Sequence, residues 1–309
     1  MTKLRVGAAQ LGPIQAADDR RTVVARLLAL LDQAKEQGVE LLVFPELALT
    51  TFFPRHYASD RASMDRWFER EMPGPETAAL FARARAHRIG FCLGYAELTP
   101  EGRHFNTAIL VDREGVTVGK YRKVHLPGHV EYDPARSFQH LEKRYFEPGD
   151  LGFPVFRTMG GVMGMMVCND RRWPESWRML GLQGVELVML GYNTPASNPQ
   201  RPAEAAEMRL FHHRLSIQAG AYQNSTWAVA VAKCGVEDGH HLIGGSLIVN
   251  PDGEIVAESR TEEDELVVHE IDLAATRFGK ATMFDFARHR RVEHYGLITA
   301  AAAGSPAEE

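Results

Sequence analysis

Short apolar runs alternate with stretches of helical spacing along most of the chain, and this alternation limits the fold more than any other feature. Leu4–Gln10 and Leu41–Phe44 are apolar runs typical of buried strands. Between them, Thr22–Gln37 carries apolar residues at helical spacing and is followed by Gly38, a residue type that often ends helices. Repetition of this pattern predicts an α/β protein in which helices cover the outer faces of sheets.

The same alternation continues through the second half of the chain. Further strands are expected at Phe91–Leu98, Phe105–Asp112, Val116–Arg122, Val162–Cys168, Val185–Tyr192, Ser225–Lys233, Leu247–Asn250, Glu254–Glu258 and Leu266–Ile271. Further helices are expected at Pro75–Arg88, Pro174–Leu182 and Arg201–Gly220, and an irregular segment at Arg136–Phe153. No linker interrupts the pattern, so we expect one domain over residues 1–298 and a frayed tail over residues 299–309. Periodicity alone leaves open whether the strands form one sheet or two.

Charge and cysteine content narrow the class of protein. The 309 residues carry a formal net charge of -5, whereas a nucleic-acid binder shows a concentrated basic patch, so no nucleic-acid partner is expected. No apolar run approaches the roughly 18 residues of a membrane helix, and the first residues lack a secretory pattern. We therefore expect a cytoplasmic protein without membrane contact. Three widely spaced cysteines, Cys92, Cys168 and Cys234, make a poor disulfide framework.

No metal-binding pattern stands out in the sequence. Paired C-x-x-C motifs and an H-E-x-x-H helix are absent, and the nearest approaches to a metal site are the pairs His212/His213, His240/His241 and His125/His129. Adjacent residues on a helix point in different directions, which favours packing and surface roles for the first pair. We expect neither a metal nor another cofactor, with a histidine metal site kept as a distant alternative.

Cys168 is the first candidate for chemistry. It ends the apolar run GVMGMMV, and Pro174 follows shortly after it in a position favoured at the first turn of a helix. The cysteine is therefore expected at a strand-to-helix elbow, where thiols near helix N-termini and cations become more acidic. Free cysteines are often simply buried apolar groups, but the polar residues after Cys168 favour a functional role.

Glu46 and Lys123 are the second and third candidates. Glu46 follows the expected strand Leu41–Phe44 and could serve as a general base, although a helix cap or a solvated acid is the simpler interpretation. Lys123 closes another expected strand and could stabilise an oxyanion, although it could equally be a solvated lysine at a strand end. Together with Cys168 they supply a base, a cation and a nucleophile at strand ends, a set that indicates covalent catalysis by a thiol.

The segments around these three residues resemble a known family. FPELALTTFFP, GKYRKVHLPGH and VCNDRRWPESWR resemble, in the right order, the Glu, Lys and Cys motifs of the nitrilase superfamily. HLEKRYFEPGDLGFPV and GYNTP are similar to one branch of it, the N-carbamoyl-D-amino acid amidohydrolases or D-carbamoylases. The resemblance covers the chain from about Leu4 to Leu297. It implies a four-layer α-β-β-α sandwich that forms homodimers or homotetramers through helical faces.

The resemblance also implies roles for individual residues. Cys168 would be the nucleophile, and Glu46 the base that takes the thiol proton and later activates water. Lys123 and the backbone N–H of Asn169 would stabilise the tetrahedral intermediate. Glu142 would be a second acid that supports Lys123 and the substrate. No metal is implied.

The substrate implied by the resemblance is a small molecule, an N-carbamoyl-D-amino acid, whose α-carboxylate needs a cationic partner. Arg171 and Arg172 match the carboxylate-binding positions, and guanidinium groups bind carboxylates with paired hydrogen bonds. Arg171 is the favoured one, because neighbours in sequence seldom point the same way. Other substrate-contacting positions are matched by His125, His140, Asn193 and Thr194. Without a substrate role, the arginines would be solvated charges at a helix entry, and His140 and Asn193 would make core hydrogen bonds.

Two other functions remain open at the level of sequence. The first is a different carbon–nitrogen hydrolase of the same framework, namely an aliphatic amidase, a nitrilase or a β-ureidopropionase, which needs no carboxylate clamp. The second is a non-catalytic scaffold, which would be expected to lack at least one of the three catalytic residues. The D configuration of the substrate comes from the resemblance, since nothing in the residue spacing encodes handedness.

Overall fold

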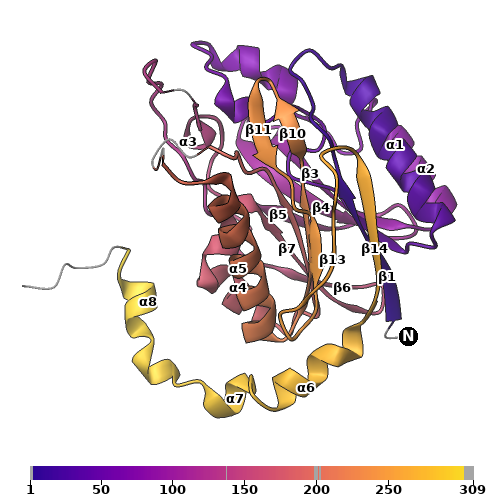
Figure 1. Ribbon diagram of the computed structural model, residues 1–309, viewed down its shortest axis with the longest axis vertical. Helices are drawn as coiled ribbons and strands as arrows, with labels where there is room; N and C mark the ends of the chain where they lie inside the picture. The colour runs from indigo at the N-terminus through magenta and orange to yellow at the C-terminus, as the bar shows by residue number, and fades with distance from the viewer. Residues whose placement is uncertain (1–2, 137, 198–200, 202, 303–309) are drawn as a thin grey trace, which may run out of the picture.

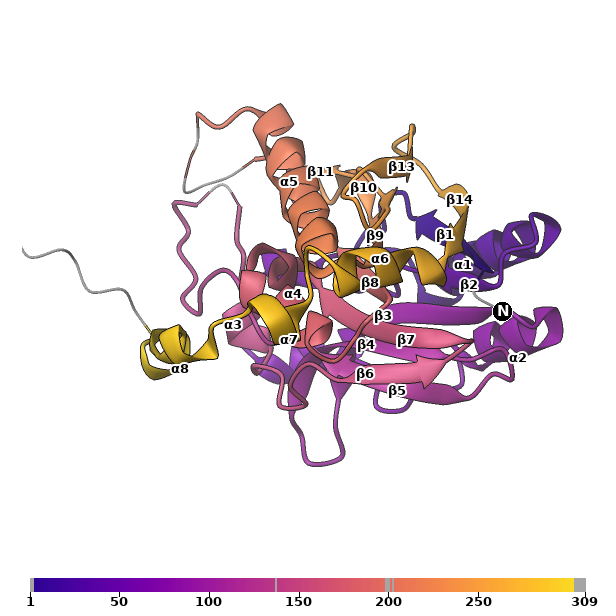
Figure 2. The ribbon, with the colours of Figure 1, turned by 90° about the horizontal axis from the view of Figure 1, so that it is seen from below.

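Two six-stranded sheets stack face to face, and helices cover their outer faces, which gives four layers in the order α-β-β-α (Figures 1 and 2). The computed structural model describes residues 3–136, 138–197, 201 and 203–302. The α/β class and the layered arrangement expected from the sequence are confirmed. The question left open by periodicity is answered by two sheets rather than one.

The first sheet is built from the N-terminal half of the chain and one late strand. Its strand order is β14-β1-β2-β3-β4-β5, in which β1, β2 and β3 are parallel and the other pairings antiparallel. The bounds are β1 Lys3–Gln10, β2 Leu41–Val43, β3 Gly90–Leu98, β4 His104–Val111, β5 Thr117–Arg122 and β14 Glu265–Asp272. Its outer face is covered by α1 (Arg20–Glu36) and α2 (Ala78–His87), whose apolar residues pack on the sheet.

The second sheet comes from the second half of the chain. Its strand order is β13-β12-β9-β8-β7-β6, in which β7, β8 and β9 are parallel. The bounds are β6 Val155–Thr158, β7 Gly161–Val167, β8 Leu187–Tyr192, β9 Trp227–Ala232, β12 Leu247–Val249 and β13 Ile255–Glu258. Its outer face is covered by α4 (Pro174–Gly181) and α5 (Ala206–Asn224). Both sheets therefore carry a central parallel set whose carboxyl ends lead into loops.

The helix α1 shows how local sequence sets an element. The Asp19 side chain accepts a hydrogen bond from the Thr22 amide at 2.7 Å and caps the first turn. The helix then buries a stripe that includes Leu27 and Leu31. Gly38 follows at a φ of 68°, a left-handed conformation that glycine adopts without strain. Each fully buried leucine contributes about 1.5–3 kcal/mol relative to an exposed one.

Several elements were not expected from the sequence. They are the hairpin strands β10 (Cys234–Glu237) and β11 (His240–Ile243), strand β6, and the helices α3 (Glu142–Tyr145), α6 (Thr276–Ala281), α7 (Phe286–His289) and α8 (Gly296–Ala300). Short 3₁₀ helices span Phe53–Arg55, Arg61–Trp67, Cys168–Arg172, Leu273–Ala275 and Val292–His294. The helix expected from Arg201 begins at Ala206 instead. The expected tail boundary at residue 299 falls inside α8, and residues 303–309 lie outside the described part of the chain.

Within the described ranges, no helix combines the length and apolar character needed to cross a bilayer. The cytoplasmic location stays a prediction.

Candidate active site

The three sequence candidates meet where strands of both sheets end. Glu46 follows β2, Lys123 follows β5, and Cys168 follows β7. The Lys123 Nζ lies 2.8 Å from Glu46 Oε1 and 2.5 Å from Glu142 Oε2, and all three side chains are fully buried. The fold thus joins two carboxylates through one ammonium group, with the cysteine carried by a strand of the facing sheet.

Cys168 occupies the elbow that the sequence predicts. It begins the 3₁₀ turn Cys168–Arg172 between β7 and α4, and its φ of 49° is uncommon for a residue with a side chain. Such a conformation costs of order 1–3 kcal/mol and clusters at functional sites. The thiol donates a weak hydrogen bond to the Asn193 carbonyl at 3.6 Å. The backbone N–H of Asn169 lies in the first turn, where amides have no acceptor within the helix.

The charges around Cys168 leave it in need of a base. Burial raises the pKa of the Cys168 thiol, and the Glu46 carboxylate raises it further, against the opposing effect of Lys123. Burial alone would lower the pKa of Lys123, but its interactions with Cys168 and with the carboxylates of Glu142 and Glu46 outweigh burial and raise it. At neutral pH the resting site therefore holds a thiol and an ammonium, so attack by sulfur requires transfer of its proton.

Glu46 is held in place by two asparagines. The Asn193 backbone N–H donates to Glu46 Oε2 at 3.0 Å, and the Asn193 side-chain amide donates to the Glu46 carbonyl at 2.9 Å. The Asn106 side chain donates to Glu46 Oε1 at 2.8 Å. Asn106 was missed by the sequence analysis, although an asparagine inside the otherwise buried strand β4 was the available signal. These bonds fix the orientation of the carboxylate.

Two glycines allow the Glu46 segment to pass between the sheets. A Cβ added to Gly94 on β3 would lie 2.6 Å from the Pro45 carbonyl oxygen. A Cβ added to Gly191 on β8 would lie 2.4 Å from the Glu46 backbone nitrogen. Because real Cβ atoms do not approach backbone this closely, a side chain at either position would displace Glu46.

Asp170 is a second buried residue that the sequence analysis missed. Its Oδ2 accepts from the Tyr121 hydroxyl at 2.7 Å and from the Val167 amide at 3.1 Å. Its Oδ1 lies 2.9 Å from both the backbone nitrogen and the ring Nδ1 of His125. Asp170 therefore ties the Cys168 turn to the segment that follows Lys123, and it orients the His125 ring.

Glu142 and His140 lie on the side of Lys123 away from Glu46 in the chain of charged contacts. The His140 Nε2 lies 2.8 Å from Glu142 Oε1. Burial alone would raise the pKa of Glu142, but Lys123 and His140 outweigh it and lower that pKa. Glu142 is therefore a carboxylate at neutral pH, and it shares the Lys123 ammonium with Glu46.

The two adjacent arginines face different environments, and the expectation that favours Arg171 for the substrate carboxylate stays a prediction. Arg171 is 1% exposed, and it donates to the Cys168 carbonyl at 2.7 Å and to the Thr194 hydroxyl at 3.0 Å. Arg172 is exposed and lines a cleft. Successive residues of a 3₁₀ turn point about 120° apart, so the turn directs one guanidinium inward and the other outward.

The cleft beside the buried centre has a volume of about 490 Å³. Among the described residues that line it are His140, Asn169 and three arginines, Arg136, Arg172 and Arg209, and none of them is a carboxylate. Arg136 pairs with Asp133 and Arg209 with Glu204.

Arg172 is the cation of the cleft that forms no ion pair with any described residue. It makes one polar contact there, with Asn169 Oδ1 at 3.3 Å. The positive charge of Arg171, followed by desolvation, lowers the pKa of Arg172. An anion bound beside Arg172 would supply the missing counter-charge.

The other matched residues differ in their position relative to this cleft. His140 lines it, while Asn193 and Thr194 are each 2% exposed and form the wall behind Cys168. The His125 ring stacks on Trp173 at a centroid distance of 4.9 Å and borders a neighbouring pocket of about 360 Å³.

The histidine pair that offered a metal alternative points in two directions. His213 is buried, with its Nε2 3.2 Å from the Gly245 carbonyl, whereas His212 contacts Glu204 at 3.6 Å. In the part of the chain that the structure describes, no three His, Cys, Asp or Glu side chains are grouped so that they could hold a metal ion.

A comparison with models of known protein families shows the family of this chain. The model of the carbon-nitrogen hydrolase family matches residues 5–281. The chain belongs to the carbon–nitrogen hydrolases. Members of this superfamily use a cysteine nucleophile on carbon–nitrogen bonds, so the nitrilase-superfamily resemblance of the sequence is confirmed at this level.

Individual carbon–nitrogen hydrolases are similar over nearly the whole chain. A nitrilase from Pyrococcus abyssi is 29% identical over 293 residues, which cover 94% of this chain and 99% of the relative. An N-carbamoylputrescine amidase from Solanum lycopersicum is 28% identical over 299 residues, covering 94% and 93% of the two chains. These relatives act on different substrates by name, so identity at this level defines a family and not a substrate.

Solved structures agree with the fold. The crystal structure of a carbon-nitrogen hydrolase from Helicobacter pylori G27 matches with a TM-score of 0.83 at 25% identity, covering 97% of this chain and 99% of that one. An amidase mutant from Nesterenkonia sp. AN1, which shows covalent addition at its active site cysteine, matches with a TM-score of 0.69 at 24% identity, covering 94% of each chain.

Proposed function

We propose that this carbon–nitrogen hydrolase converts N-carbamoyl-D-amino acids to D-amino acids, ammonia and carbon dioxide. The observation that carries the proposal is Arg172, an arginine that forms no ion pair with the described residues and lines a cleft without carboxylates. The cleft reaches Asn169, the residue after Cys168. An α-carboxylate close to the scissile ureido group would pair with Arg172 by charge-assisted hydrogen bonds.

The charge of the cleft favours an anionic carbamoyl substrate over a cationic one. Several relatives are N-carbamoylputrescine amidases, and N-carbamoylputrescine carries an amine, which Arg172 in this cleft would repel. The segments HLEKRYFEPGDLGFPV and GYNTP support the D-carbamoylase branch. The D configuration of the substrate rests on that resemblance.

The first half of the proposed reaction forms a covalent intermediate. Glu46 accepts the proton of the Cys168 thiol, and the sulfur adds to the ureido carbon. Lys123 and the backbone N–H of Asn169 hold the oxyanion, which is where preorganised donors act most strongly. The carbon–nitrogen bond to the terminal amino group then breaks, and ammonia leaves with the proton from Glu46. A thiocarbamate on Cys168 remains.

The second half releases the product. Glu46 accepts a proton from a water molecule, which attacks the thiocarbamate carbon, and the carbon–sulfur bond breaks as the thiol is restored. The released N-carboxy amino acid loses carbon dioxide and gives the free amino acid. Glu142 and His140 keep Lys123 charged and in place throughout, while Asn193 and Thr194 shape the wall behind the sulfur.

We also propose that the protein forms a homodimer or homotetramer through its helical faces. Exposed apolar side chains gather on the outer layer of the second sheet and on the C-terminal helices. They include Met179 on α4, Phe211 and Leu215 on α5, and Leu297 and Ile298 on α8. Figures 1 and 2 show α7 and α8 reaching away from the sheets beside α4. Sedimentation equilibrium tests this assembly, and a monomer at micromolar concentration would contradict it.

Ammonia release tests the proposed function. The assay compares N-carbamoyl-D-phenylalanine, its L enantiomer and the uncharged 3-phenylpropanamide. The D carbamoyl compound is expected to have the highest kcat/KM, because it alone combines the ureido group, the carboxylate and the D configuration. A preference for the uncharged amide would replace the proposal with an amidase of the same family.

A further inference from the structure

A second cluster of buried charges lies beside the catalytic centre and takes no part in the proposed chemistry. Its members are Arg55, Lys233 and Glu237, at 5%, 0% and 0% exposure. The Lys233 Nζ lies 2.8 Å from Glu237 Oε2, and Arg55 Nη2 lies 2.8 Å from Glu237 Oε1. Lys233 follows β9 and Glu237 ends β10, so both come from the second sheet and its hairpin.

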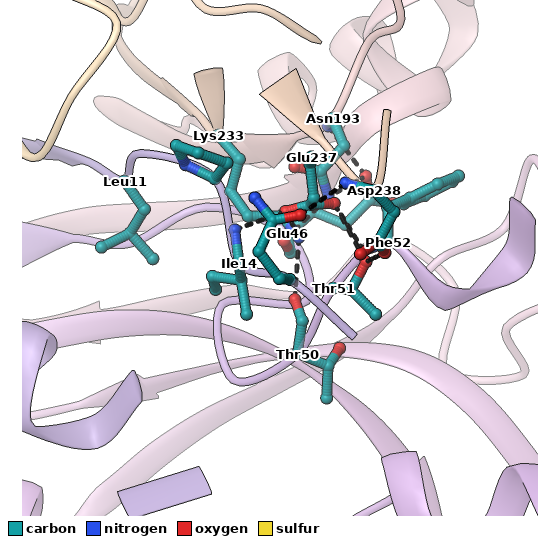
Figure 3. A network of polar contacts seen from close by, with 12 residues as sticks. Leu11, Ile14, Glu46, Thr50, Thr51, Phe52, Asn193, Lys233, Glu237 and Asp238 are labelled. Carbon is teal, nitrogen blue, oxygen red and sulfur yellow. Dashed lines mark hydrogen bonds and ion pairs between the residues drawn. The ribbon is translucent and has the colours of Figure 1, made fainter. Parts of the chain in front are cut away.

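This cluster fastens the loop that carries Glu46. The Lys233 Nζ donates to the Thr50 carbonyl at 2.8 Å, and the Phe52 amide donates to Glu237 Oε1 at 2.7 Å. Figure 3 shows Lys233 and Glu237 beside Glu46, with Thr50 and Phe52 around them. The loop is thus tied to β9 and β10 four to six residues after Glu46.

The two clusters carry opposite net charges. With every group in its usual state, Glu46, Lys123 and Glu142 sum to one negative charge. Arg55, Lys233 and Glu237 sum to one positive charge. Burying either set alone is costly, whereas burying the two side by side offsets part of that cost.

The clusters also interact with each other across the loop. Burial lowers the pKa of Lys233, whereas Glu237, and more weakly Glu46, act to raise it. Burial likewise lowers the pKa of Arg55. Lys233 and Glu46 therefore interact electrostatically across the loop that separates them.

We propose that Lys233 and Glu237 are positioning residues that act through Glu46. They hold its loop in place, and their opposite charges act in opposite directions on the ability of the Glu46 carboxylate to accept the Cys168 proton. This inference rests on the proposed role of Glu46 as the base and on no particular substrate.

Other charged groups face the same loop and stay unchanged in the test. Glu46 faces Lys123 and Cys168 on its catalytic side. At the rim, Asp238 pairs with His56 at 3.0 Å, and His240 lies near Arg55.

The test is the pH dependence of kcat/KM in Lys233→Met, Glu237→Gln and the double variant. Loss of the Lys233 cation should move the acidic limb of the profile to higher pH, by roughly 0.5–1 unit. Loss of the Glu237 anion should move it to lower pH by a similar amount. The double variant removes one charge of each sign and should return close to the wild-type limb.

A merely structural role would lower kcat in both single variants without moving the limb in opposite directions. Unmoved limbs, or limbs that move the same way in folded single variants, would therefore overturn the proposal. Lys280→Met is the matched control, because this part-buried ammonium donates to the Val185 carbonyl away from the cluster and should leave the limb unchanged. Thermal melting checks that each variant is folded.

The rate of Cys168 alkylation by iodoacetamide against pH gives the same readout without a substrate. If the wild-type protein hydrolyses no carbamoyl compound or amide, the proposed function fails. The opposite shifts of the alkylation profile still decide whether Lys233 and Glu237 act on Glu46.

Discussion

The buried centre and the mouth of the cleft differ in how their charged side chains are buried and paired. In the centre, Glu46, Lys123 and Glu142 are fully buried and paired with one another at 2.5–2.8 Å. At the mouth, Arg172 is exposed and forms no ion pair with the described residues. The paired, buried charges of the centre are held in position before substrate binds. The exposed Arg172 guanidinium gains a counter-charge only when an anionic substrate binds.

This contrast separates the reaction from the choice of substrate. The centre supplies a base, an oxyanion partner and a nucleophile, which any carbon–nitrogen hydrolase of the family needs. The cleft supplies a counter-charge that only an anionic substrate uses. Changes in the centre should therefore reduce kcat, and changes at the mouth should raise KM for charged substrates.

Removal of the nucleophile should have the largest effect. Cys168→Ala is expected to lower turnover by more than about a thousandfold while substrate still binds, because the covalent intermediate cannot form. Ammonia release measures the loss, and isothermal titration measures the retained binding. Full activity in this variant would remove Cys168 from the chemistry.

Loss of the central ammonium should come next. Lys123→Met is expected to lower kcat by roughly a hundred- to a thousandfold, because the oxyanion loses a preorganised donor. It should also destabilise the fold by about 3–5 kcal/mol, since two buried carboxylates lose their shared partner. Steady-state kinetics and urea unfolding measure the two effects, and a decrease in kcat of only a few-fold would show that Lys123 is structural.

The outward arginine should act on binding. Arg172→Gln is expected to raise KM for N-carbamoyl-D-phenylalanine by about ten- to a hundredfold, because a bidentate carboxylate contact is lost. The KM for an uncharged amide should change little. An equal rise in KM for both substrates would show that Arg172 shapes the cleft and does not bind a substrate carboxylate.

At low pH, protonation of Glu142 should lower the free energy of unfolding. Because Lys123 and His140 lower the pKa of Glu142 against burial, the stability that this carboxylate contributes is present above its ordinary value of 4.5 and is lost as pH falls through the lowered value. The raised pKa of Lys123 means that its contribution is present below 10.5 and is lost at higher pH. The difference in unfolding free energy between wild type and Glu142→Gln should therefore be larger at pH 7 than at pH 3. An equal difference at both pH values would contradict this linkage.

Substitution of a carboxylate outside the centre should have the smallest effect on activity. Glu97 bonds Arg122, Lys120 and Thr107, which together overcome burial and lower the pKa of Glu97 to about 2. Glu97→Gln is expected to cost about 1–3 kcal/mol of stability at pH 7, an effect that fades between pH 4.5 and 2. Its kcat/KM should stay within about twofold of wild type, and a large loss would extend the catalytic centre to β3.

Much of this organisation was predictable because long periodic segments and strand ends are visible in a sequence. The α1 segment and the strand before Cys168 follow directly from apolar spacing, and Glu46, Lys123 and Cys168 all lie at or just after the ends of expected strands. The hairpin β10–β11 was missed because its strands, CGVE and HHLI, contain no continuous apolar run.

Sequence patterns could not show which residues, distant in sequence, form hydrogen bonds with one another in the fold. Asn106 and Asp170 are single polar residues whose importance comes from distant acceptors and donors, namely Glu46 for the first and Tyr121 for the second. The different environments of Arg171 and Arg172 could not be predicted, because they depend on the tight turn at Cys168, whose positive φ no periodicity reveals.

Peptide mapping by mass spectrometry after rapid acid quench tests the central claim most directly. Wild-type protein is mixed with N-carbamoyl-D-phenylalanine and digested, and the peptide that contains Cys168 is weighed. We expect a transient thiocarbamate on the Cys168 sulfur that forms and decays at rates compatible with ammonia release. Turnover without any adduct on Cys168, or with an adduct on Cys92 or Cys234 instead, would contradict the account.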